Sequence, residues 1–170
     1  MHRYKHKKTS EDLIKFFKIL KVKSLYYIPN RFIDGYGSSI KLIKKIIVKK
    51  PNLVIISNPL SPIGEYKTKE EITEIADVCK KLNCILLIDE AYIEFADGVS
   101  MIGMINDYDN VLISRTFSKA FGAAGIRLGY LIGNSELINK VTKFQLTYPL
   151  SNVTVKFGMY LLDNISISSP

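Results

Sequence analysis

Residues 84–92 read Cys-Ile-Leu-Leu-Ile-Asp-Glu-Ala-Tyr, a run of five apolar residues that stops at two acids. Consecutive apolar residues without alternation are typical of a strand that is buried on both faces of a parallel sheet. Similar short runs occur at Leu53–Ile56, Val111–Ser114 and Leu128–Ile132, and Ser24–Ile28 is a shorter candidate. We therefore expect a sheet whose strands end next to polar residues.

Segments with helical periodicity separate these strands. The expected helices are Glu11–Leu20 with Ser10 as its N-cap, Ser38–Lys50, a helix capped by Thr68, Ser135–Phe144 and Val153–Leu162. Thr68 and Glu71 have the spacing of a capping box at a helix start. The alternation of strands and helices predicts an α/β fold, a three-layer sandwich with a mainly parallel sheet and right-handed crossovers.

The apolar faces of two of these helices can be read from the same spacing. In the helix that follows Thr68 we expect a buried stripe, which makes Cys79 a core residue rather than a reactive thiol. The stripe comprises Ile72, Ile75, Ala76, Cys79 and Leu82. The helix at 38–50 is expected to bury Ile40, Ile43, Ile46 and Ile47, with lysines opposite.

Composition excludes several classes of protein. The chain has 170 residues, 47% hydrophobic and 24% charged, which is typical of a folded globular domain. Its net charge of +8 comes from 20 lysines and only four arginines, concentrated in residues 1–50. A solvated lysine face explains this better than a nucleic-acid site, which favours arginine forks and stacked aromatics. Two cysteines and two histidines predict neither a disulfide framework nor a metal site. We expect no membrane span or signal peptide, and a cytoplasmic location.

Polar side chains follow three of the expected strands. Asn58 follows the first, Asp89 and Tyr92 the second, and Ser118 and Lys119 the third. In parallel α/β sheets, ligands bind beyond the carboxyl ends of the strands. The sequence therefore predicts a site where an amide, a carboxylate, a phenol, a hydroxyl and an amine converge.

The neighbours of Lys119 suggest a specific chemistry. Thr116 and Ser118 precede it, and a glycine-containing loop leads to Arg127. An amine can condense with an aldehyde, while hydroxyls and a guanidinium fork hold a phosphate. This combination favours a phosphorylated aldehyde as ligand, although a lysine after a strand is more often an ordinary surface residue.

The other candidates also have plain structural interpretations. Asp89 could cap a helix or pair with Arg115, or its carboxylate could face a pyridinium nitrogen. Tyr92 could pack or donate a hydrogen bond to a ring oxygen, and Asn58 could simply set the turn before a proline. Glu90 and Glu94 are expected to be solvated or structural.

Three motifs together resemble a known family. They are Asn58-Pro59-Leu60-Ser61-Pro62-Ile63-Gly64, Asp89-Glu90-Ala91-Tyr92-Ile93-Glu94-Phe95, and Arg115-Thr116-Phe117-Ser118-Lys119-Ala120-Phe121-Gly122 with Arg127. This set is similar to the fold-type I pyridoxal-phosphate aminotransferases, and most similar to the histidinol-phosphate aminotransferase branch, which also contains threonine-phosphate decarboxylase. The likeness covers about residues 25–162.

The resemblance implies pyridoxal 5'-phosphate as cofactor and assigns a role to each matching residue. Lys119 would be the Schiff-base lysine and proton carrier. Asp89 would face the pyridine nitrogen, and Asn58 and Tyr92 would donate to the phenolic oxygen. Thr116, Ser118 and Arg127 would hold the phosphate. The partners implied are an amino donor, a keto acceptor and a second subunit in a homodimer.

This sequence also departs from the family pattern. The turn has Leu60, Ser61 and Ile63 where the family has polar residues. The chain is less than half the family's length, so residues 1–170 are expected to be the central part of a large domain. A first phosphate loop, a stacking aromatic and a substrate-binding arginine are not found in it.

Three hypotheses follow. The first is a truncated aminotransferase of the histidinol-phosphate type, with a threonine-phosphate decarboxylase as the alternative within the same coenzyme class. The second is a non-catalytic remnant of the fold that binds the coenzyme weakly or only associates with a partner that supplies the missing parts. The third is a basic nucleic-acid module, which would show steep salt dependence of binding and lacks a readout motif.

Overall fold

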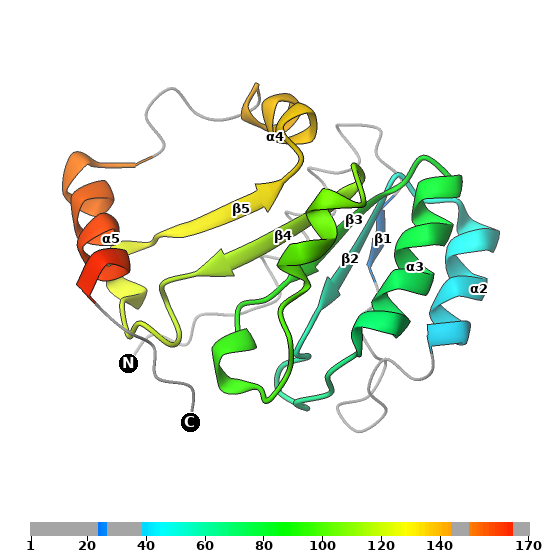
Figure 1. Ribbon diagram of the computed structural model, residues 1–170, viewed down its shortest axis with the longest axis horizontal. Helices are drawn as coiled ribbons and strands as arrows, with labels where there is room; N and C mark the ends of the chain where they lie inside the picture. Colours follow the sequence, from blue (N-terminus) through cyan, green and yellow to red (C-terminus); the bar gives the residue numbers. More distant parts are fainter. Residues whose placement is uncertain (1–23, 27–38, 144–149, 165–170) are drawn as a thin grey trace, which may run out of the picture.

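The computed structural model describes residues 24–26, 39–143 and 150–164, and Figure 1 shows the arrangement of the elements. A five-stranded sheet has the order β1-β2-β3-β4-β5. The strands are β1 (Ser24–Tyr26), β2 (Leu53–Ser57), β3 (Ile85–Asp89), β4 (Val111–Thr116) and β5 (Gly129–Gly133). The first four are mutually parallel, and β5 pairs antiparallel with β4. The predicted α/β class and mainly parallel sheet are confirmed.

Of the helices in the described residues, two lie between strands of the sheet and two follow its last strand. They are α2 (Ser39–Lys49), α3 (Lys69–Lys81), α4 (Ser135–Thr142) and α5 (Asn152–Asn164), with short 3-10 turns η1 (Ile93–Phe95), η2 (Met101–Asn106) and η3 (Ala124–Ile126). The capping box at Thr68 and Glu71 is present, so α3 begins where the sequence predicts. The helix expected at Glu11–Leu20 lies outside the described residues.

The main core lies between one face of the sheet and the layer formed by α2, α3 and η2; Figure 1 shows α2 and α3 side by side to the right of β1 and β2. Alternate residues of β2 and β3 are fully buried on this face, and those on the other face are half-buried. The predicted stripe of α3 holds: Ile72, Ile75, Ala76 and Cys79 are fully buried and Leu82 packs against them.

The predicted face of α2 is partly wrong. Leu42 and Ile46 are fully buried and Ile43 packs against the core, but Ile40 and Ile47 are 59% and 49% exposed. The buried residues of α2 are therefore Ser39, Leu42 and Ile46. Each of them stands one position before a predicted isoleucine, at Ile40, Ile43 and Ile47. Ser39 lies on this buried side, and its hydroxyl donates to Glu71 Oε1 at 2.7 Å, which joins that side of α2 to α3.

Candidate active site

The carboxyl ends of β2, β3 and β4 lie next to one another, as expected for parallel strands. Ser57, Asp89 and Ser114 are aligned across the three strands. The backbone N–H of Asn58 donates to the carbonyl of Asp89 at 2.9 Å, and that of Glu90 donates to Ser114 at 2.9 Å. These bonds place the segments that follow the three strands along one edge.

Asp89 is the last residue of β3 and is half-buried. Its Oδ1 accepts a hydrogen bond from Ser114 Oγ at 2.9 Å. The salt bridge considered with Arg115 is not formed, because the Arg115 guanidinium binds Glu90 instead. Asp89 does not cap a helix either, since Tyr92 occupies the cap position of η1. Ser114 therefore orients a carboxylate that is otherwise open toward the edge.

Tyr92 and Lys119 lie close to each other, and near enough to this carboxylate for its charge to act on Tyr92. The Lys119 Nζ lies 5.0 Å from the centroid of the Tyr92 ring. Hydrogen bonds from Lys119 and then from Ser61 lower the pKa of Tyr92, together with the positive charge of Lys119. Partial burial and the charge of Asp89 oppose this shift. Lys119 is exposed and forms no salt bridge with another described residue.

Asn58 has a different setting. Its side chain is fully buried, with Nδ2 donating to the carbonyl of Lys67 at 3.0 Å and Oδ1 accepting from the N–H of Lys67 at 2.7 Å. The amide thus fixes the turn between β2 and α3, and Nδ2 has a second hydrogen beyond this bond. Sequence reasoning did not single out Lys67, whose 2% exposed side chain pairs with Glu65 at 3.2 Å and with Glu71 at 3.6 Å.

The loop between β4 and β5 carries the remaining candidates. Thr116 Oγ1 accepts from the N–H of Ser118 at 3.1 Å and donates to the carbonyl of Leu128 at 3.4 Å. Arg127 is exposed, has a left-handed φ of 54°, and its Nη1 donates to the carbonyl of Ala124 at 3.1 Å. It makes no hydrogen bond to Thr116 or Ser118.

Two glycines leave open space beside this loop. Gly122 has a φ of +61°, a conformation that favours glycine. A Cβ built at Gly122 or at Gly125 would meet no atom within 4 Å. A ligand group can therefore approach the loop backbone closely, next to the hydroxyl of Ser118.

Glu90 and Arg115 form an ion pair that sequence reasoning did not foresee. Glu90 is fully buried, and its Oε2 accepts from Arg115 Nε at 3.0 Å and Nη2 at 2.9 Å. Burial lowers the pKa of Arg115, but the hydrogen bond and charge of Glu90, with Tyr130, outweigh it and raise that pKa above its ordinary value. Of the two expectations for Glu90, the structural one is right and the solvated one is wrong.

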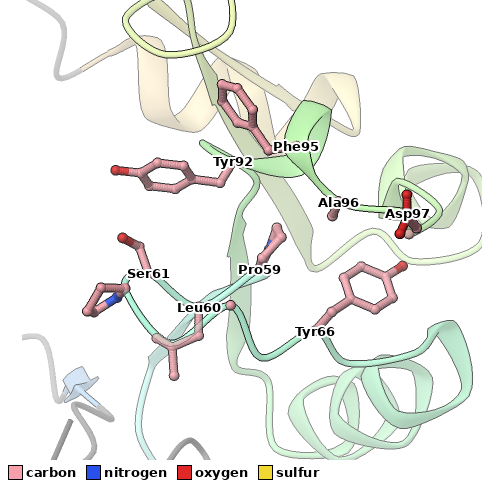
Figure 2. A pocket seen from close by; sticks show the side chains of 11 residues that line it. Pro59, Leu60, Ser61, Tyr66, Tyr92, Phe95, Ala96 and Asp97 are labelled. Carbon is pink, nitrogen blue, oxygen red and sulfur yellow. The ribbon is translucent and has the colours of Figure 1, made fainter. Parts of the chain in front are cut away.

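A cavity of about 700 Å³ lies beside Tyr92, between the turn at 59–66 and the loop at 92–98. Figure 2 shows Tyr92, Ser61 and Pro59 on one side of it and Tyr66 and Asp97 on the other. Tyr92 is the one candidate residue that lines it; Asp89, Lys119 and Arg127 do not. The cavity thus adjoins the site rather than coinciding with it.

No group of three or more His, Cys, Asp or Glu side chains in the described segments is placed to hold a metal ion. No helix in that part of the chain has the length and apolar character needed to cross a membrane.

Comparison with known proteins gives consistent results. Residues 8–167 match the family model described as aminotransferase class I and II. The histidinol-phosphate aminotransferase of Clostridium kluyveri is 38% identical over 123 residues, which is 72% of this chain and 34% of that protein. That of Thermoanaerobacter pseudethanolicus is 32% identical over 143 residues, 84% of this chain and 40% of that protein. The chain therefore spans well under half the length of these curated relatives.

Solved structures agree on the fold. Histidinol-phosphate aminotransferase from Sinorhizobium meliloti, in complex with pyridoxal-5'-phosphate, has a TM-score of 0.68 and 29% identity over 75% of this chain and 35% of that one. A decarboxylase from Sulfurospirillum multivorans has a TM-score of 0.71 over 90% of this chain and 46% of that one, at 22% identity. The second likeness shows a shared fold alone.

Proposed function

The chain belongs to the aminotransferase class I and II family, and from this premise we propose that the intact protein is a pyridoxal-phosphate-dependent aminotransferase of the histidinol-phosphate type. The observation that carries the proposal is the contact between the Lys119 amine and the Tyr92 phenol at the edge where β3 ends in Asp89. This chain would supply the central part of the large domain.

The donor set fits this coenzyme. An exposed amine, a phenol of lowered pKa and a carboxylate at a strand end lie on adjoining segments, and the loop between β4 and β5 carries hydroxyls and a guanidinium. The open space at Gly122 and Gly125 gives a phosphate access to the loop backbone. When bound, pyridoxal phosphate supplies an aldehyde carbon and a protonated ring that withdraws electrons.

Each residue of the chain then has a proposed task. Lys119 holds the coenzyme covalently through Nζ and, once released, moves a proton at the substrate carbon. Tyr92 and the second Nδ2 hydrogen of Asn58 donate to the phenolic oxygen. Asp89, oriented by Ser114, holds the proton on the ring nitrogen. Thr116, Ser118 and Arg127 bind the phosphate.

The substrates and the assembly of the intact protein are further parts of the proposal. The amino donor and keto acceptor would be an amino acid or amino phosphate and a keto acid, as the names of the relatives suggest. We propose that the intact protein is a homodimer, because a second subunit can complete a site of which this chain supplies only part. We also propose a cytoplasmic location.

Reduction with borohydride tests the covalent step. Purified chain is mixed with pyridoxal phosphate, reduced, digested and mapped by mass spectrometry over its 20 lysines. We expect a dominant adduct at Lys119, its loss in Lys119→Ala, and no change in Lys140→Ala, where an exposed lysine pairs with Glu136. Equal labelling of all lysines would contradict a coenzyme site in this chain.

A product assay on the full reading frame tests the reaction. We expect amino transfer from histidinol phosphate to a keto acid, followed as the amino acid formed. Carbon dioxide released from threonine phosphate, with no amino transfer, would favour the decarboxylase alternative. Neither activity, despite a Lys119 adduct, would favour the non-catalytic remnant.

A further inference from the structure

The Glu90 carboxylate is the most completely bonded charged group of the described residues near the site. Besides the two bonds from Arg115, its Oε2 accepts from Ser100 Oγ at 2.8 Å and its Oε1 accepts from the N–H of Met101 at 2.6 Å. Ser100 Oγ in turn accepts from Arg115 Nη2 at 2.8 Å. The cluster therefore joins the ends of β3 and β4 and the start of η2 in one network.

This cluster lies behind the candidate site. Successive side chains of a strand point to opposite faces of the sheet. Asp89 and Ser114 are register partners that bond on the ligand side, so Glu90 and Arg115, each one residue further on, project to the other side. The ion pair holds the strand ends from behind without touching the ligand space.

The segments that follow Glu90 and Arg115 in the chain carry the contact between Tyr92 and Lys119. Tyr92 comes two residues after Glu90, and Lys119 comes four residues after Arg115. Phe117, which lies between Arg115 and Lys119, is 3% exposed and packs on Phe121 and Tyr130. This packing anchors the residues that follow β4. A shift between the ends of β3 and β4 would change the separation of Tyr92 and Lys119 directly.

We propose that Glu90 and Arg115 are positioning residues that hold Tyr92 and Lys119 in contact by locking the ends of β3 and β4 together. This deepens the proposed function, on which its catalytic meaning rests, because the contact would place the amine against the coenzyme. The pair suits the task, since one buried carboxylate oxygen that accepts from two nitrogens of the same guanidinium fixes both distance and orientation.

Titration of Tyr92 in the chain without coenzyme tests the proposal. Tyrosinate absorbance is recorded against pH, and subtraction of the Tyr92→Phe curve isolates Tyr92 from the other tyrosines. The groups that set its pKa are Lys119, Ser61 and Asp89. In Glu90→Gln we expect the pKa of Tyr92 to rise toward about 10, the ordinary value for tyrosine. Glu136→Gln, at an exposed ion pair, should leave it unchanged.

A second variant keeps the test decisive if Glu90→Gln does not fold. Arg115→Lys retains the positive charge and loses the fork, and it should raise the pKa of Tyr92 in the same direction. Ser100→Ala keeps both charges, removes one donor, and should give a smaller rise. Circular dichroism selects the variants that fold. A wild-type Tyr92 titration in any folded Glu90 or Arg115 variant would overturn the proposal.

Trapping at Lys119 separates this proposal from the proposed function. If the wild-type chain gives no selective adduct but the titration shifts as expected, positioning stands and the coenzyme assignment fails. If the adduct is selective and neither variant changes the titration or the Lys119 share of labelling, the coenzyme assignment stands and the positioning role fails.

Discussion

Polar side chains on the two sides of the carboxyl edge of this sheet differ in burial and in hydrogen bonding. Behind the edge, Asn58 and Glu90 are fully buried. Both polar atoms of the Asn58 amide and both oxygens of the Glu90 carboxylate form hydrogen bonds. In front of it, Lys119 and Arg127 are exposed, and the glycine loop borders open space. The paired layer can fix the strand ends, while the open layer keeps groups available for a ligand.

This difference predicts that stability and binding depend mainly on separate sets of residues. Asn58 belongs to both sets, because its buried amide binds Lys67 and, in the proposed function, its second Nδ2 hydrogen donates to the coenzyme. A buried charge that loses its partner is costly, because desolvation is no longer compensated. An exposed charge has water as an alternative partner, so its removal changes the free energy of unfolding little. Substitutions can therefore be chosen that affect one layer and not the other.

Glu90→Ala should have the largest effect on stability. It leaves the Arg115 guanidinium, 19% exposed, without its main partner and opens a cavity, so we expect a loss of about 3–5 kcal/mol in the free energy of unfolding. Urea denaturation measures this. Glu136→Ala removes an exposed partner of Lys140 and should cost below about 1 kcal/mol. Equal losses in the two variants would break the distinction between the layers.

Asn58→Ala should come next. It leaves the buried N–H and carbonyl of Lys67 without the amide that binds both, at a cost of about 2–3 kcal/mol. Asn139→Ala, at an exposed position of α4, is the matched control, with an expected change within about 0.5 kcal/mol. A stable Asn58→Ala chain would mean that the turn does not depend on this side chain.

How much of this arrangement the sequence predicts depends on whether the signal is local. Thr68 and Glu71 define the start of α3 because capping is a contact between residues three apart. The strand ends at Asp89 and before Asn58 are visible as the limits of apolar runs. The choice of Glu90 rather than Asp89 as the partner of Arg115 is not, since it depends on which sheet face each side chain occupies.

Other features are non-local in the same sense. The acids that pair with the buried Lys67 lie close to it in sequence, but its backbone is held by the side chain of Asn58 across the turn, a contact that no periodic pattern shows. The isoleucines of α2 suggest one face, but the buried face also includes Ser39, whose hydroxyl bonds to Glu71 of α3. The roles of Thr116, Ser118 and Arg127 as a phosphate cradle stay a prediction.

Asp89→Asn sharpens the comparison from the open side. The amide keeps the shape of the side chain and can still accept from Ser114, so we expect less than about 1 kcal/mol of change in unfolding. Coenzyme affinity, measured by absorbance titration, should fall on the order of tenfold or more, because a charged partner of the ring nitrogen is lost. A large loss of stability with unchanged affinity would place Asp89 in the paired layer instead.

Ser61→Ala should have the smallest effect and tests the open layer alone. Ser61 lies in the turn that follows β2, is exposed, and hydrogen-bonds to Tyr92. A hydrogen bond that favours the phenolate lowers the pKa of a tyrosine, so its removal raises that pKa and reduces the tyrosinate fraction at any pH near it. The remaining bond from Lys119 is the larger cause, so the rise should be smaller than in Lys119→Met. The difference titration against Tyr92→Phe measures both, and Ser118→Ala, a hydroxyl on the same edge without this contact, is the control. A rise as large as that of Lys119→Met would show that Ser61, and not the amine, sets the state of the phenol.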